Sequence, residues 1–64
     1  MTKVKIAFIG KQEDIEHDLD RLGIIWNGEV YTTYPPFFYA QCPNENIDEL
    51  FALPWVYSVL SYVV

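Results

Sequence analysis

The sequence has few of the residues that small proteins use for covalent or metal-based stabilisation. Its 64 residues include one cysteine, Cys42, and one histidine, His17. A single cysteine cannot close an internal disulfide, and one Cys with one His does not make the four-ligand set of a structural zinc site. A domain of this size buries only about 60% of the surface of its unfolded chain, so its stability is marginal. Oligomerisation or binding to a partner is the remaining way to increase that stability. We expect a single domain, 1–64, without metal or cofactor.

Basic residues and long apolar runs are also scarce. Nine acidic residues against four basic ones give a net charge of −5, which argues against direct binding of nucleic acid through its phosphates. No run approaches the roughly 20 apolar residues of a membrane span, and residues 1–10 lack the apolar length and cleavage site of a signal peptide. The lone free cysteine suits a reducing compartment. We therefore expect a cytoplasmic protein that contacts neither nucleic acid nor membrane.

The first third of the chain has the pattern of a strand followed by a helix. Residues 4–8 alternate apolar and other side chains, which predicts a strand with one buried face. The segment Lys11–Leu22 predicts an amphipathic helix that ends at Gly23. Its apolar stripe at i, i+4 and i+7 consists of Ile15, Leu19 and Leu22.

The middle of the chain predicts two strands around a proline pair. Glu29–Tyr34 is rich in β-branched and aromatic residues and is expected to form the second strand, after a turn at Asn27-Gly28. Pro35-Pro36 must interrupt it, because proline has no amide hydrogen to donate. Phe37–Cys42 is expected to return as the third strand, whereas the apolar segment Ile24–Asn27 is compatible with either a strand or a packed loop.

The last third predicts a short helix and a final strand. Asn46 is a good N-cap, and Glu49 three residues later completes a capping-box pattern. Pro54 ends this helix, and residues 55–64 favour a strand. The buried face of the helix is expected to consist of Ile47, Leu50 and Phe51.

This order of elements is β-α-β-β-α-β without a spare linker. Right-handed crossovers place both helices on one face of the sheet. The sequence therefore predicts an α+β, ferredoxin-like two-layer sandwich, in which two helices cover one face of a four-stranded antiparallel sheet.

Aromatic residues crowd the predicted strands. On a sheet that has helices on one face alone, some of these rings must lie on the open face, where a charge-poor, tyrosine-rich surface is typical of an interface. Cross-strand stabilisation by tyrosine is the simpler explanation of the same pattern. The candidate protein-binding residues are Tyr31, Tyr34, Phe38, Tyr39, Trp55 and Tyr57.

The predicted first helix offers a second candidate surface, which is acidic. It would dock electrostatically on a basic protein, such as a nucleic-acid-binding protein. Compact acidic proteins of this size are similar to phage-encoded inhibitors such as anti-CRISPR proteins. The residues of this acidic surface are Glu13, Asp14, Glu16, Asp18 and Asp20.

Residues for catalysis are few, and we expect no enzymatic activity. His17 lies among acidic residues, as on a solvated helix face. Cys42 falls in a predicted strand, where it is more often a small buried apolar residue than a nucleophile. The glycine of AFIGKQEDI lacks the surrounding pattern of a phosphate-binding loop. The strands likewise lack the basic and aromatic signature of an RNA-recognition sheet.

Three segments carry a resemblance to a known family. GEVYTTY, FFYAQCP and IDELFALPWVYSV together resemble the propeptide-type inhibitors of subtilisin-like proteases. The resemblance implies a protease partner that contacts the open sheet face. Those inhibitors also insert a C-terminal tail into the protease, and SVLSYVV leaves little chain for one. Small ligand-sensing ACT-type modules are similar in the order of their elements, so a small-molecule sensor remains an alternative. A homodimer that covers the aromatic sheet face is another alternative.

Overall fold

The computed structural model of the chain describes residues 1–61. The strands and helices follow the predicted order, with one short 3₁₀ turn before the second helix. They are β1 (Thr2–Phe8), α1 (Gln12–Arg21), β2 (Ile25–Trp26), β3 (Phe37–Cys42), η1 (Asn44–Asn46), α2 (Ile47–Phe51) and β4 (Val56–Ser61). The last three residues of the predicted final strand, 62–64, lie outside the described residues.

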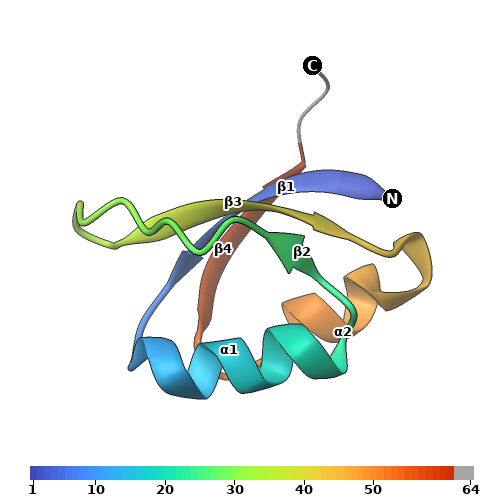
Figure 1. The fold of residues 1–64 in the computed structure, drawn as a ribbon, viewed down its shortest axis with the longest axis horizontal. Helices are drawn as coiled ribbons and strands as arrows, with labels where there is room; N and C mark the ends of the chain where they lie inside the picture. The colour runs from blue at the N-terminus through green and yellow to red at the C-terminus, as the bar shows by residue number, and fades with distance from the viewer. Residues whose placement is uncertain (62–64) are drawn as a thin grey trace.

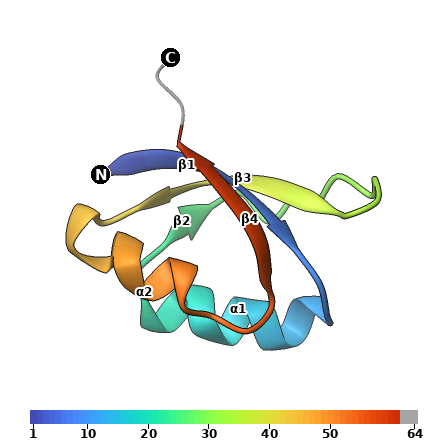
Figure 2. The same cartoon turned by 180° about the vertical axis from the view of Figure 1, so that it is seen from behind.

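The four strands form one antiparallel sheet in the order β2-β3-β1-β4. Both helices lie on the same side of this sheet, and no helix of residues 1–61 lies on its other side (Figure 1, Figure 2). The predicted ferredoxin-like sandwich is thereby confirmed. Its physical cause is that each helix has one apolar stripe, and both stripes are buried against the same face of the sheet.

The core lies between the helices and that face of the sheet. Phe38 is its largest fully buried side chain, with ring-centroid distances of 4.7 Å to Trp26 and 5.7 Å to Phe8. The predicted stripe of α1 is buried as expected. The other buried residues of the cluster include Val4, Ile6, Ile15, Leu19, Leu22, Ile24, Ala40, Cys42, Leu50 and Trp55.

The second strand is not where the sequence predicted it. Glu29–Tyr34 does not form a strand; within it Tyr31 alone makes an isolated bridge, to Phe37. The strand is instead Ile25–Trp26, in the segment whose pattern was ambiguous. The larger apolar side chains decide the outcome, because Trp26 packs on Phe38 whereas residues 31–34 are exposed. Apolar burial here outweighs the β-propensity of 29–34.

The second helix has its N-cap at Asn46, as predicted, but its capping and its packing differ from the prediction. The side chain of Asn46 makes no capping hydrogen bond; its Nδ2 donates instead to the Leu22 carbonyl oxygen at 2.8 Å, which ties α2 to the end of α1. Leu50 is buried and Ile47 is half-buried, as predicted, but Phe51 is 59% exposed. Phe51 is the last residue of this five-residue helix, and its side chain stays largely in contact with solvent.

A hydrogen bond joins α1 to the segment before β4. The indole nitrogen of buried Trp55 donates to Oδ2 of Asp18 at 2.7 Å. Asp18 is thus the one member of the predicted acidic surface that is half-buried. It also lies 3.5 Å from Arg21, an exposed contact of the kind that contributes little to stability.

We expect Asp18→Ala to lower the free energy of unfolding by about 1–3 kcal/mol, because the indole N–H would remain buried without an acceptor. Asp14→Ala is the matched control, since it removes the same charge from an exposed position of α1 and should change stability by less than about 0.5 kcal/mol. Urea denaturation followed by circular dichroism measures both. Equal effects of the two substitutions would contradict the assigned role of the hydrogen bond.

A candidate binding surface on the open sheet face

Strand alternation decides which side chains lie on the open face. In β1, Val4 and Ile6 face the helices, so Lys3, Lys5 and Ala7 face the other way. Antiparallel register then places cross-strand neighbours on the same side. Lys5 pairs with Tyr39 of β3 and Leu60 of β4, while Ala7 pairs with Phe37 and Ser58.

Three aromatic rings from two segments pack together on this face. We call Tyr31, Phe37 and Tyr39 the aromatic cluster. Tyr31 and Phe37 stack with centroids 4.9 Å apart and planes within 8°. Tyr39 meets both rings edge-on at 5.7 Å. Two backbone hydrogen bonds between Tyr31 and Phe37, of 2.8 and 3.1 Å, hold the 27–36 segment against β3.

The cluster remains accessible although its rings contact one another. Tyr31 is 47% exposed and Tyr39 is 42% exposed. Mutual packing fixes the rotamers of these rings before any partner arrives, which lowers the entropy lost on binding. The cluster is therefore a preorganised apolar surface.

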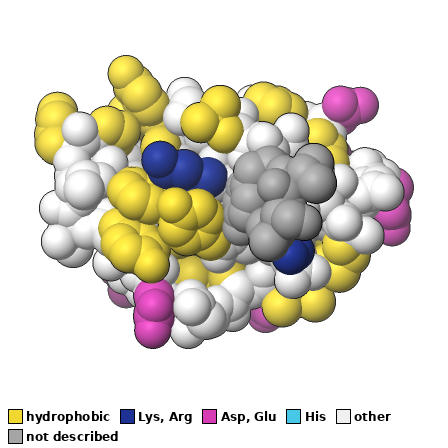
Figure 3. Space-filling model, turned by 90° about the horizontal axis from the view of Figure 1, so that it is seen from above, with side chains coloured by type: hydrophobic (Ala, Val, Ile, Leu, Met, Phe, Trp, Pro, Cys, Tyr) yellow, Lys and Arg dark blue, Asp and Glu magenta, His cyan; other side chains and the backbone are white. Residues whose placement is uncertain are grey.

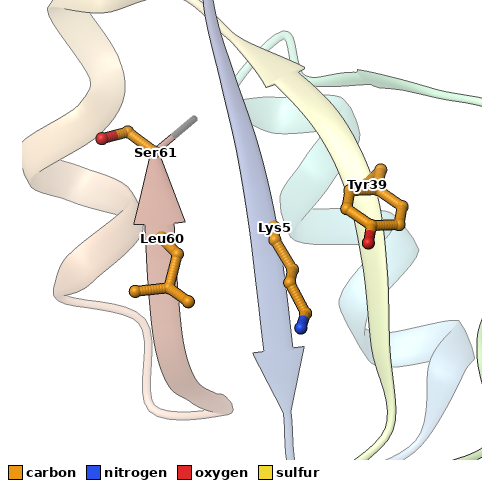
Figure 4. A pocket seen from close by; sticks show the side chains of 4 residues that line it. All are labelled: Lys5, Tyr39, Leu60 and Ser61. Atoms are coloured by element: carbon orange, nitrogen blue, oxygen red, sulfur yellow. The ribbon is translucent and has the colours of Figure 1, made fainter. Parts of the chain in front are cut away.

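Lysine side chains lie beside the cluster on the central strand. The ammonium of Lys5 is 4.3 Å from the centroid of the Phe37 ring, a cation–π distance. Lys5 also lines an open hollow of about 660 Å³ together with Tyr39, Leu60 and Ser61. In Figure 4 the Lys5 side chain lies between Leu60 on one neighbouring strand and Tyr39 on the other. The hollow thus has two apolar walls with a positive charge between them.

The remaining exposed tyrosines adjoin the cluster. Tyr34 and Tyr57 line one hollow with Lys5 and Phe37, and a neighbouring hollow of about 330 Å³ with Pro35 and other apolar residues at the end of β1. The predicted residues Tyr31, Tyr34, Tyr39 and Tyr57 are therefore brought to one side of the molecule.

Two of the predicted binding residues are in the core. Phe38 is fully buried and Trp55 is 8% exposed, so the expectation that they lie on the binding surface is wrong. Phe38 has the strand parity of Ala40 and faces the helices, whereas Trp55 precedes β4 and closes the end of the core. Phe38 therefore offers no surface to a partner, and Trp55 offers very little.

Sequence reasoning missed three members of the surface, which are Lys5, Phe37 and Leu60. Alternation alone divided β3 into Phe37-Tyr39-Gln41 and Phe38-Ala40-Cys42 without saying which set faces the helices. Two smaller residues in the second set gave a usable signal, because Ala40 and Cys42 leave room for the helix side chains that pack against that face.

Charge is divided between the two layers of the fold. None of the residues in the four strands is an Asp or a Glu, and β1 contributes Lys3 and Lys5 to the open face. Figure 3 looks onto this face and shows hydrophobic side chains gathered around lysine, with acidic side chains at the rim. Among the described residues, the charged side chains that the strands place on the open face are therefore lysines, although the net charge of the chain is −5.

Eight of the nine acidic residues belong to α1, η1 and α2, and the ninth, Glu29, lies in the 27–36 segment. Glu13, Asp14, Glu16 and Asp20 are exposed on α1, and Asp18 is half-buried against Trp55. These five residues, predicted to form an acidic surface, do share one helix. They lie in the layer opposite the aromatic cluster, so the two candidate surfaces are separate.

The possible reactive groups do not gather into a site. Cys42 is buried, and burial raises the pKa of its thiol, with a smaller contribution from the charge of Glu45. This keeps the thiol protonated at neutral pH. His17 is exposed on α1. Among residues 1–61, no three His, Cys, Asp or Glu side chains converge as metal ligands would.

Comparisons with known proteins add no indication of function beyond this surface. No helix within the described part of the chain is long and apolar enough to cross a bilayer. No protein-family model matches the chain, and no match was found among curated proteins or among solved structures.

Proposed function

We propose that the chain is a non-enzymatic protein-binding module, an inhibitor or regulator, that acts through its open sheet face. The aromatic cluster carries this proposal, because it exposes two tyrosines that are already ordered by Phe37. Tyrosine and other aromatic residues are enriched at protein interfaces, where a few of them contribute most of the binding energy.

The chemistry of the face indicates what a partner must offer. Apolar side chains would pack on the rings of Tyr31 and Tyr39 and enter the hollow beside Leu60. A carboxylate above Lys5 would be matched by its ammonium group, since the strands contain no acidic residue to compete for it. A partner segment that combines apolar and acidic side chains therefore fits this face.

The acidic surface of α1 would bind a partner of the opposite charge from the one that fits the open face. A basic protein, including a nucleic-acid-binding one, would be attracted to Glu13, Asp14, Glu16 and Asp20 and repelled by Lys5. We favour the open face because Asp18 is engaged with Trp55 and the other acids are typical of a solvated helix. Salt separates the two modes, since screening weakens a charge-driven complex far more than an apolar one.

The test is capture of partners by the immobilised chain, followed by affinity measurements on the captured protein. Tyr39→Ala should cost at least about 2 kcal/mol of binding, or roughly 30-fold in Kd, if Tyr39 is a hot spot. Phe51→Ala is the matched control, because it removes an exposed aromatic ring from the helical layer. Its effect on Kd should be less than about threefold.

Two outcomes would overturn the proposal. A captured partner could keep its affinity for Tyr39→Ala and Tyr31→Ala but lose it when Asp14 and Glu16 are replaced by lysine. The acidic surface of α1 would then be the binding site. Alternatively, no protein would be captured and a small metabolite would raise the melting temperature, which would indicate a ligand-sensing module.

A protease is one partner class that can be assayed directly. The resemblance to propeptide-type inhibitors predicts slower hydrolysis by a subtilisin-like protease when the chain is in excess. Unchanged progress curves would remove proteases from the candidates and leave the binding surface itself untouched. Inhibition that survives Tyr39→Ala would instead place the contact away from the open face.

A further inference from the structure

The two edges of the sheet are unequal. On one edge, β2 has two residues, and the 27–36 segment beyond it is held to β3 by the Tyr31–Phe37 bridge. On the other edge, β4 runs for six residues, Val56–Ser61. Among the described residues β4 pairs with β1 alone, and Figure 2 shows it at the near side of the sheet. Its outer row of backbone N–H and C=O groups is therefore available to another strand.

Apart from one register irregularity near its beginning, β4 lacks the devices that normally protect an edge strand. Soluble proteins place lysine, proline or an inward-pointing charge on such strands, or make them very short. The strand VYSVLS contains no charged residue and no proline. The register irregularity in its pairing with β1 lies at Ala7/Phe8, toward the beginning of β4, so the rest of the strand is regular. Tyr57 and Leu60 are both about 60% exposed.

The charges on three surfaces of the chain indicate which of them a second copy can contact. Two copies stacked through their open faces would bring Lys5 against Lys5, and two copies meeting through α1 would bring acids against acids. A copy paired through β4 brings only uncharged side chains together. Of these three surfaces, the edge is thus the one at which the contacting strand side chains bring no like charges together.

We propose that β4 pairs antiparallel with β4 of a second copy of this chain, which makes a two-fold dimer with a continuous eight-stranded sheet. The inference does not depend on the proposed function. A two-fold axis perpendicular to the sheet places both open faces on the same side. The dimer therefore presents two aromatic clusters together, and a partner with two contact sites would gain avidity without any new contact.

The salt dependence of this dimer has a definite sign. Each copy has a net charge of −5, and α2, which packs beside β4, carries Asp48 and Glu49. Like charges therefore oppose association across the seam while the strands themselves contribute none. Added salt screens this repulsion, so dimerisation should become tighter from 0.05 to 0.5 M NaCl. Binding driven by opposite charges would become weaker over the same range.

Sedimentation equilibrium of the purified chain tests the proposal. The expected result is a monomer–dimer equilibrium that shifts toward dimer with salt. Ser58→Lys places a lysine on the exposed edge strand, and like charges across the seam should weaken the dimer by at least about tenfold. Thr32→Lys is the matched control, because it makes the same change of charge at an exposed position of the 27–36 segment. It should leave the dimer unchanged.

A second measurement tests the contact itself. Cys42 is buried, so a cysteine introduced at position 57, 58 or 60 is the only accessible thiol among the described residues. Mild oxidation should link two copies through at least one of these positions, and Thr32→Cys should remain unlinked. A monomer at every salt concentration up to about 1 mM protein would overturn the proposal. So would a dimer that Ser58→Lys leaves intact, since another surface would then hold it.

Discussion

Phe38→Ala is expected to lower the free energy of unfolding by about 3–5 kcal/mol. Phe38 has no exposed surface, and its ring contacts Trp26 of β2 and Phe8 of β1. Its removal would leave a cavity at the point where three strands meet the helices. Since single domains are stable by about 5–15 kcal/mol, the loss should leave a chain of this size marginally folded. Urea denaturation followed by tryptophan fluorescence measures the change.

The adjacent residue is the natural control for Phe38. Phe37→Ala makes the same chemical change on the opposite face of β3, where the ring is half-buried between Tyr31 and Lys5. We expect a loss of about 1 kcal/mol, the size of an aromatic pair contact at a surface. Equal losses for Phe37→Ala and Phe38→Ala would show that the two faces of the sheet have been assigned wrongly.

Leu50→Ala is expected to cost about 2–5 kcal/mol. Leu50 is fully buried and is the one residue of α2 in the buried core. A helix of five residues has no stability of its own in water, so its packing through Leu50 maintains it. We therefore expect the loss of helical circular dichroism to accompany the fall in melting temperature.

Phe51→Ala is the control for Leu50→Ala, because it changes helix propensity without removing a side chain from the core. Phe51→Ala replaces an exposed ring with the residue of highest helix propensity, so stability should change by less than about 0.5 kcal/mol. A large loss at Phe51 would mean that the apolar face predicted from the sequence, rather than the one in the structure, is buried. Melting curves of the two variants decide between these possibilities.

The division of charge between the two layers has a consequence for partner choice. The strands contain lysine and no acid, while α1 contains five acids and one basic residue, Arg21. A partner therefore meets a different sign of charge according to the side from which it approaches. Electrostatic attraction steers the encounter over distances near the Debye length, so charge selects the side before short-range packing acts.

Most of the fold could be predicted because its elements carry strong local signals. The α1 stripe of Ile15, Leu19 and Leu22 has helical spacing and is buried as expected. The third strand was predicted at the residues where the structure has it, Phe37–Cys42, because prolines on both sides mark its ends. These signals act over a few residues, so tertiary contacts had little room to override them.

The candidate surface was predicted less completely. Tyr31 and Tyr39 were identified, and the structure brings them together with Phe37. Phe38 was assigned to the surface and is in the core. Propensity cannot distinguish adjacent aromatic residues of one strand, because both favour a strand equally. Only the location of the helices decides which of the two is covered.

Local pattern was sufficient for the order of the elements, the layer architecture and the excess of acidic residues on α1, because each depends on neighbours within one or two helical turns. The folded chain alone decided that Trp26 rather than Val30 enters the sheet, that Asp18 binds Trp55 and that Phe51 is exposed. Each of these outcomes depends on residues far apart in the sequence that compete for one core. The side chains that bury the larger apolar surface occupy the core, whatever their local propensity.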